Sequence, residues 1–330
     1  MGCRKKALAI GTISCRFASA DGTATILFGN GDGSFQLGQT YVAGGSPIVV
    51  ADVNGDGIPD LVVLAGVLLG NGNGTFQPLL AFSAGEGPNS LAVADFNGDG
   101  VLDIVTTNFG VGGDPRNPVV TENGVRILLG NGDGTFQAAQ PIAIQPSDSR
   151  PAFVVVGDWN HDGNVDLAVA SAESGTLTIL LGKGDGTFQV GRTYMVGAGL
   201  TALAVADLNG DGQLDVVAAN TGTFLVSGKL TVFLGKGDGT FQPGHTYPIA
   251  PRPYTLSVAI GDFNHDGIAD VVLADGSGAR IFLGNGDGTL QAAQVYAAGS
   301  GGDLVVADWN GDGLPDLALS NSATILLNQP

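Results

Sequence analysis

A nine-residue pattern, D-x-N-x-D-G-x-x-D, occurs six times along the chain, at residues 52–60, 95–103, 158–166, 207–215, 262–270 and 308–316. Asp, Asn and Asp at positions 1, 3 and 5 can bring side-chain oxygens to one point, because the Gly at position 6 lets the backbone bend sharply. Position 7 then offers a backbone carbonyl and position 9 a carboxylate. The pattern therefore predicts an oxygen-lined site for a hard cation such as Ca²⁺.

Five oxygen ligands are predicted in each loop, so up to six calcium ions are expected as structural cofactors. An EF-hand begins in the same way, but it needs a Glu at position 12 and flanking helices, whereas position 12 here is apolar or Thr. A tight turn would explain one Asp, yet not four oxygen-bearing side chains at fixed offsets in six copies. The predicted ligands are Asp52, Asn54, Asp56, Ile58, Asp60, Asp95, Asn97, Asp99, Val101, Asp103, Asp158, Asn160, Asp162, Asn164, Asp166, Asp207, Asn209, Asp211, Gln213, Asp215, Asp262, Asn264, Asp266, Ile268, Asp270, Asp308, Asn310, Asp312, Leu314 and Asp316.

The net charge agrees with a cation-binding interpretation. It is −18 at pH 7, and the six loops hold 18 of the 31 acidic residues. Six divalent ions would bring the formal charge to −6, whereas without them the carboxylates of a loop repel one another. Because an acidic field repels phosphate groups, neither nucleic acid nor anionic lipid is expected as a partner.

The remaining loop positions have structural interpretations. Position 2 is always apolar, so we expect it to pack inward. His161 and His265 replace the Gly found at position 4 in the other copies, and we expect both to face solvent rather than to catalyse. His245 is a lone histidine in a predicted strand.

A second motif, L-G-[NK]-G-[DN]-G-[TS]-[FL]-Q with small variations, also occurs six times and alternates with the first. Its glycines are reminiscent of a phosphate cradle, but a strand follows where a helix would be required. A second metal site is also disfavoured, since Lys183 and Lys236 replace an Asn and Asn73 replaces an Asp. We interpret the motif as a tight turn, with phenylalanines that pack between repeats, namely Phe35, Phe76, Phe136, Phe188 and Phe241.

Each repeat alternates like four short strands, and no ten-residue amphipathic helix occurs between the motifs. The predicted fold is therefore an all-β propeller with seven blades of about four antiparallel strands, because seven strands of the type that enters the glycine turn can be counted. The first unit lacks an aspartate loop, and the last ends after its third strand. An alternative of six blades follows if residues 35–43 complete the last blade.

Residues 21–330 are predicted to form this single propeller domain. Two interpretations of residues 1–20 stay open. Basic residues, a short apolar stretch and Ala18-Ser19-Ala20 are typical of a secretory signal peptide, whereas residues 7–13 also read as a first strand. The two cysteines, Cys3 and Cys15, form no disulfide framework, and no apolar stretch elsewhere could span a membrane.

Over residues 21–330, the alternation of these motifs resembles the FG-GAP/VCBS repeat proteins, including the β-propeller of integrin α subunits. The resemblance implies a seven-bladed, calcium-stabilised propeller that is secreted or held at the cell surface and binds proteins or glycans in adhesion. Integrin propellers carry fewer calcium loops than six, and we see neither an integrin-type stalk nor a membrane anchor. We therefore expect a monomer rather than an integrin-like heterodimer.

Two classes of function remain open. The first is a non-enzymatic binding module for proteins or glycans, and the second is a polysaccharide-active, lyase-like enzyme with its site in the upper funnel of the propeller. No nucleophile and base stand at a recognisable spacing, which favours the first. Strand order places aspartate loops and glycine turns on one face, so we expect ligands on the opposite face, whose candidates are Phe109, Arg116, Glu122, Phe224, Arg252 and Tyr254.

Overall fold

The computed structural model describes residues 8–12, 22–29, 35–43, 47–109, 124–142, 144, 150–222, 227–249, 257–275, 277–297, 304–308, 310–319 and 324–328. All regular elements in these residues are β-strands, which confirms the all-β prediction. The same residues contain no helix that is long and apolar enough to cross a membrane.

The strands form seven antiparallel sheets in which each strand pairs with the next one along the chain. Sheet 1 contains β1 (Leu8–Thr12), β2 (Thr23–Gly29) and β3 (Phe35–Val42). Sheet 2 contains β4 (Ile48–Ala51), β5 (Asp60–Val63), β6 (Gly66–Leu68) and β7 (Leu80–Ala81). Sheet 3 contains β8 (Pro88–Ala94), β9 (Asp103–Asn108), β10 (Gly124–Leu128) and β11 (Gln140–Ile142).

The later sheets repeat this arrangement. Sheet 4 contains β12 (Pro151–Gly157), β13 (Asp166–Ser171), β14 (Thr176–Gly182) and β15 (Phe188–Met195). Sheet 5 contains β16 (Leu200–Ala206), β17 (Asp215–Asn220), β18 (Lys229–Phe233) and β19 (His245–Pro248). Sheet 6 contains β20 (Ser257–Gly261), β21 (Asp270–Asp275), β22 (Gly278–Phe282) and β23 (Gln294–Ala297), and sheet 7 contains β24 (Leu304–Ala307), β25 (Asp316–Leu319) and β26 (Thr324–Leu326).

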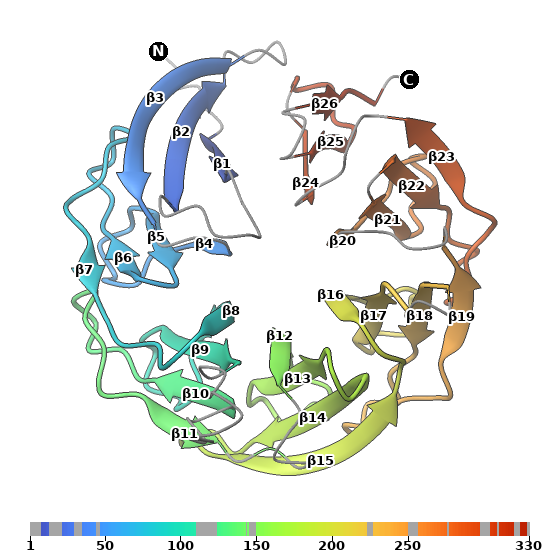
Figure 1. Ribbon diagram of the computed structural model, residues 1–330, viewed down its shortest axis with the longest axis horizontal. Helices are drawn as coiled ribbons and strands as arrows, with labels where there is room; N and C mark the ends of the chain where they lie inside the picture. The colour runs from blue at the N-terminus through green and yellow to red at the C-terminus, as the bar shows by residue number, and fades with distance from the viewer. Residues whose placement is uncertain are drawn as a thin grey trace, which may run out of the picture.

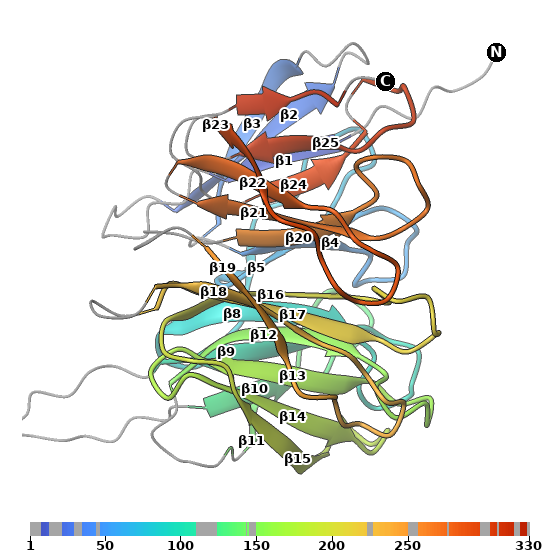
Figure 2. The ribbon, with the colours of Figure 1, turned by 90° about the vertical axis from the view of Figure 1, so that its right-hand side faces the viewer.

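The sheets follow one another around a ring, so the fold is a β-propeller, as predicted (Figure 1). The first strand of each four-stranded sheet lies nearest the centre and the fourth lies on the rim. Seen edge-on, the strands run between two faces on which the connecting turns gather (Figure 2).

The predicted blade number is wrong for the described residues. Five sheets have the four strands of a complete blade, so neither seven complete blades nor the alternative of six is found. The difference arises because, in the described part of the chain, sheet 1 has no inner strand with an aspartate loop and sheet 7 has no outer strand. The suggested loan of residues 35–43 to the last blade is also wrong, since β3 pairs with β2 through Thr23↔Val42 to Gly29↔Phe35.

The core lies between neighbouring sheets. The second strands β5, β9 and β13 are wholly buried because a sheet packs on each of their faces, which explains the apolar residues that follow the aspartate in each strand. Hydrophobic clusters join every pair of sheets that are consecutive in the chain, for example Val105, Val125, Val154 and Val169 between sheets 3 and 4. Each blade is therefore stabilised mainly by its neighbours.

Aromatic residues tie the glycine turns of sheets 2 to 5 to the preceding blade, as the sequence predicts for their phenylalanines. Edge-to-face ring pairs join Phe82 to Phe136, Phe96 to Phe188 and Trp159 to Phe241, with centroid separations of 5.6, 5.8 and 6.3 Å. Tyr41 packs on Phe76 in the same manner, and the side chain of Phe35 lies outside the described residues.

Candidate functional site

The aspartate loops share a burial pattern that differs between copies only at position 1. Position 5 is exposed, position 9 is buried and, in five copies, position 1 is half-buried. In the first loop, Asp52 accepts hydrogen bonds from the N–H groups of Gly55 and Gly57, at 2.8 and 2.7 Å. Asp56 accepts the N–H of Ile58 at 2.7 Å. The short polar side chains therefore fold the loop through its own backbone amides.

The ninth aspartate has a role that the sequence prediction missed. In Asp166, Oδ2 accepts the N–H of Trp159 at 3.0 Å and Oδ1 accepts the N–H of Gly182 at 2.8 Å, the first glycine of the glycine turn. The same two bonds, to position 2 and to the turn glycine, are made by Asp60, Asp103, Asp215 and Asp270. This carboxylate thus joins the aspartate loop to the glycine turn, which places both on one face as predicted.

Sheet 7 keeps this connection without a glycine turn. The N–H of Asn328 donates to Asp316 Oδ1 at 2.7 Å, and Nδ2 of Asn328 donates to the carbonyl of Phe263 in sheet 6 at 2.8 Å. The glycine turns reach the preceding blade in a similar way, since Gly239 N–H donates to the carbonyl of Trp159 at 2.9 Å. The joined turns therefore also hold neighbouring blades together.

Burial raises the pKa of Asp60, Asp103, Asp166, Asp215 and Asp270 above the ordinary value of 3.8, and for Asp166 the pKa rises to about 6. The main cause is loss of hydration, and the charges of Asp162 and Asp158 in the same loop add to it. The two backbone hydrogen bonds oppose the rise because they favour the ionised form. The raised values follow from the buried position of these carboxylates at the start of a strand.

The donor chemistry of the loops fits a hard cation. Each loop presents carboxylate and amide oxygens, without nitrogen or sulfur ligands, and Asn54 Nδ2 donates to Asp56 Oδ2 at 3.0 Å, so positions 3 and 5 lie together. Among the described residues, however, no three acidic, histidine or cysteine side chains are gathered closely enough to hold a metal ion. At position 9, both carboxylate oxygens accept hydrogen bonds from backbone amides, as in Asp60.

The variable loop positions lie as predicted. All five position-2 side chains in the described residues are buried, and Trp309 lies outside them. His161 and His265 are exposed and adopt the positive φ angles of 56° and 61° that the glycines take in other copies. His161 Nε2 contacts Gln213 Oε1 of the next loop, and His245 is exposed on β19.

The glycine turns bring blades into close contact. Gly134 has a φ of 83°, and a Cβ atom there would lie 2.8 Å from Cδ2 of Leu69 in sheet 2. The Asp133 carboxylate accepts both the N–H and the hydroxyl of Thr135, which holds the turn and lowers the pKa of Asp133. The motif is thus a tight inter-blade turn, as predicted.

The predicted ligand-face residues are only partly described. Phe109 is half-buried directly after β9, and its N–H donates to the carbonyl of Gly87 at 3.0 Å. The other five candidates, Arg116, Glu122, Phe224, Arg252 and Tyr254, lie outside the described residues.

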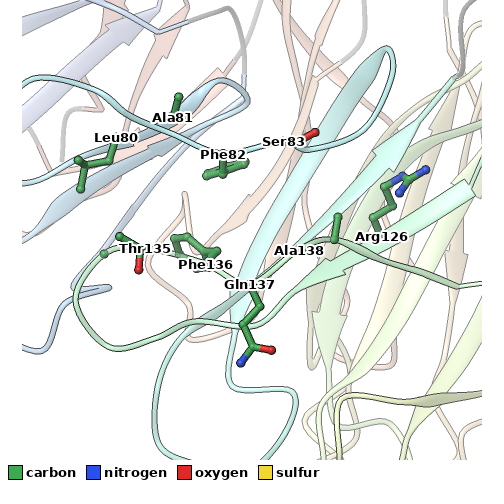
Figure 3. Close-up of a pocket in the computed structure, with 11 residues that line it drawn as sticks. Leu80, Ala81, Phe82, Ser83, Arg126, Thr135, Phe136, Gln137 and Ala138 are labelled. Carbon is green, nitrogen blue, oxygen red and sulfur yellow. The ribbon is translucent and has the colours of Figure 1, made fainter.

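A groove on the rim between sheets 2 and 3 was not predicted. It has a volume of about 360 Å³ and is lined by residues 80–83 of sheet 2 and by Arg126 and residues 134–139 of sheet 3. Figure 3 shows the rings of Phe82 and Phe136 side by side, with Arg126 at one end and Leu80 at the other. Its residues come from two repeats and from no single motif, so sequence spacing gave no signal for it.

Comparisons with known proteins agree with the fold. The FG-GAP-like repeat matches residues 15–63, 65–106, 119–169, 158–218, 207–273 and 262–319. No curated protein matches the chain in sequence.

Several solved structures have the same architecture. A lectin from Agrocybe aegerita, described as recognising non-reducing terminal N-acetylglucosamine, is 22% identical with a TM-score of 0.59, over 97% of this chain and 90% of the lectin. A periplasmic gluconolactonase from Pseudomonas aeruginosa is 14% identical with a TM-score of 0.62, over 98% of this chain and 86% of that chain. A putative 6-phosphogluconolactonase from Bacteroides uniformis is 13% identical with a TM-score of 0.64, over 89% and 83%. These identities show the fold alone.

Proposed function

The chain belongs to the FG-GAP-like repeat family, and on this premise we propose that it is a non-enzymatic carbohydrate-binding propeller whose sugar site is the groove between sheets 2 and 3. The groove volume of about 360 Å³ falls in the range of small-molecule sites. Its lining combines apolar surface with a few polar groups, which is typical of such sites.

The observation that carries this proposal is the ring pair in the groove. Phe82 and Phe136 are only half-buried, with their centroids 5.6 Å apart. The exposed side chains of Ser83 and Gln137 lie beside them. Aromatic faces can cover the apolar C–H surface of a sugar ring, while an amide and a hydroxyl can bond its hydroxyl groups.

The Agrocybe aegerita lectin supports a carbohydrate as the ligand class, since this chain shares its architecture over nearly its whole length. The two lactonase-like neighbours keep the enzymatic alternative, a polysaccharide-active enzyme, open to test. Against that alternative, the aspartates with raised pKa are buried, and their oxygens hold backbone amides. Release of product from a polysaccharide panel would favour the enzyme over the binding module.

A glycan array with matched variants tests the binding module. Gln137→Ala removes a polar group of the groove, and we expect it to weaken retained glycans about fivefold, since a hydrogen bond contributes about 1 kcal/mol. Gln77→Ala is the control, because Gln77 holds the equivalent exposed position after the glycine turn of sheet 2 but does not line the groove. Failure of the wild type to retain any glycan would reject the proposal.

The aspartate loops are assigned a structural role as calcium sites. Asp52, Asn54, Asp56, the Ile58 carbonyl and Asp60 would hold an ion in the first loop, and the equivalent residues would do so in the other five. When bound, Ca²⁺ would offset the repulsion among the carboxylates of a loop. Such loops suit a calcium-rich exterior, so the protein is assigned to a secreted or cell-surface location and to a monomeric state.

Thermal melting tests the calcium assignment. Ca²⁺ should raise the melting temperature over an EDTA sample, because an ion that binds only the folded state stabilises it by about 2.7 kcal/mol per site at a hundredfold excess over Kd. Asp56→Asn should reduce this rise, whereas Asp133→Asn, in a glycine turn, should not. Identical melts in Ca²⁺ and EDTA would refute the assignment.

A further inference from the structure

One position on or directly after the outer strands carries a hydroxyl in some sheets and none in others. It lies six residues after the Phe or Leu that ends the glycine turn. The residue is tyrosine in sheets 1, 4, 5 and 6, but it is Phe82 in sheet 2 and Ile142 in sheet 3. The two junctions that follow sheets 2 and 3 therefore lack a group that the repeat supplies elsewhere.

Where the tyrosine is present, its hydroxyl closes the junction with the next blade. In three sheets the hydroxyl accepts the N–H of the residue that ends the next glycine turn, at 2.8 or 2.9 Å, and the pairs are Tyr41–Phe76, Tyr194–Phe241 and Tyr247–Leu290. The residue that donates is buried in all three pairs, with an exposed fraction of 8% or less. The amide is therefore satisfied and covered by the same side chain.

The junction of sheets 2 and 3 has the same ring pair without the hydroxyl. The rings of Phe82 and Phe136 are 5.6 Å apart at an interplanar angle of 68°, close to the 5.6 Å and 78° of Tyr194 and Phe241. The backbone amides of Asn131 and Gln137 have carbonyl acceptors, but no atom of the described residues accepts the N–H of Phe136. Because an amide without an acceptor costs free energy, this position favours a molecule that supplies one.

This amide belongs to the groove between sheets 2 and 3. Phe82 and Phe136 both line the groove, and Phe136 is half-buried there rather than buried (Figure 3). Ser83 and Gln137 line the same groove and carry oxygens that can accept a hydrogen bond. The junction of sheets 3 and 4 differs, because Ile142 has no ring and packs against the hydrophobic cluster between those sheets.

We infer that the Phe136 N–H is the anchor of the groove, and that it binds a sugar hydroxyl whose oxygen takes the place of the tyrosine hydroxyl at the other junctions. This inference rests on the proposed carbohydrate-binding function. A sugar hydroxyl fits this position because it can accept the N–H and donate its own hydrogen to Ser83 or Gln137. The phenylalanine at position 82 is then the residue that makes this junction a binding site.

The test restores the hydroxyl with Phe82→Tyr and compares the variant with the wild type on one glycan array. The variant should weaken the retained glycans about tenfold, because the anchor amide then has an acceptor within the protein. The same variant should have a higher urea midpoint than the wild type, since the Phe136 N–H gains a hydrogen bond. A gain of stability together with a loss of binding excludes a folding defect.

A matched variant and a direct measurement assign the effect to this amide. Phe188→Tyr adds the same hydroxyl to a half-buried ring that pairs edge-to-face with Phe96 but does not line the groove, so it should leave glycan retention unchanged. Hydrogen exchange followed by NMR reports on the Phe136 N–H itself. In the wild type, its exchange should slow when the best-retained glycan of the array is added.

Each contrary result has its own meaning. Unchanged glycan retention by Phe82→Tyr, or an unchanged urea midpoint, would overturn the inference and leave the carbohydrate-binding function standing. Glycan binding that does not slow the exchange of the Phe136 N–H would do the same, as would an equal loss of retention in Phe188→Tyr. If the wild type retains no glycan on the array, both proposals are rejected.

Discussion

Three tyrosine hydroxyls join neighbouring blades, and removing one of them should lower stability by a predictable amount. Tyr194 in sheet 4 accepts the N–H of Phe241 in sheet 5 at 2.8 Å. Tyr41 accepts the N–H of Phe76 at 2.9 Å, and Tyr247 accepts the N–H of Leu290 at 2.8 Å. Each bond links an outer strand to the glycine turn of the next blade.

The expected magnitude follows from what Tyr194→Phe leaves behind. The ring keeps its packing against Phe233 and Phe241, so no cavity forms. The N–H of Phe241, a residue with an exposed fraction of 2%, loses its acceptor. An amide left unsatisfied in this way costs about 1–2 kcal/mol in the free energy of unfolding. Substituting Tyr41 and Tyr247 together should cost about twice as much, because they are in distant sheets.

Urea unfolding followed by fluorescence measures these losses, and Tyr296→Phe is the matched control. Tyr296 holds the same place on β23, but its hydroxyl donates to Gln294 Oε1 within its own strand, and the residue is 44% exposed. We expect the control to change the free energy of unfolding by less than about 0.5 kcal/mol. If Tyr194→Phe proves no more destabilising than Tyr296→Phe, the hydroxyls do not stabilise the contact between blades.

Three further predictions concern the turns and the buried acids. Gly134→Ala should lower the free energy of unfolding more than Gly100→Ala. Both residues have a positive φ, which costs about 1–2 kcal/mol for alanine, but only a Cβ atom at position 134 meets a leucine of the neighbouring blade. Equal decreases in the urea midpoint would contradict this. Asp275→Asn should cost about 3–5 kcal/mol by leaving Arg280 without its buried partner, and a loss below 1 kcal/mol would refute that. In EDTA, the free energy of unfolding of the wild type should fall relative to that of Asp166→Asn as pH rises from 4 to 7. The reason is that Asp166 has a folded-state pKa raised to about 6, so its contribution to stability is fully present below pH 4 and is lost as pH rises through 6. A relative gain of stability over that window would contradict the sign.

The parts of the fold that the sequence predicts are those that depend on short-range patterns. Alternating apolar residues specify strands, and the position-2 side chains are buried as their apolar character requires. Glycines at positive φ specify the turns, and His161 and His265 show that two copies adopt the same angle without glycine. These features are local, so one repeat is enough to recognise them.

The features that the sequence does not predict depend on contacts between repeats or between motifs. Asp60 stands at a ligand position of the aspartate loop, but spacing alone does not say that its oxygens bond Val53 and Gly70. One signal was present, since each ninth aspartate is followed directly by at least two apolar residues, which indicates that it begins a buried strand. The number of complete blades was predicted wrongly because the third strand, which was counted, occurs once in every sheet. Whether a blade is complete depends on the strands before and after that strand.

Residues that every blade needs and residues that a ligand needs occupy different positions in this repeat. The ninth aspartate, the position-2 side chain and the turn glycine hold each blade together, so a change at any of them would weaken the ring. The third-strand position that Arg126 occupies is not constrained to one residue type, because Thr, Gly and Arg all occur there among the sheets. Its side chain lines the groove at the junction of two blades. Recognition should therefore change through such junction positions while the scaffold stays the same.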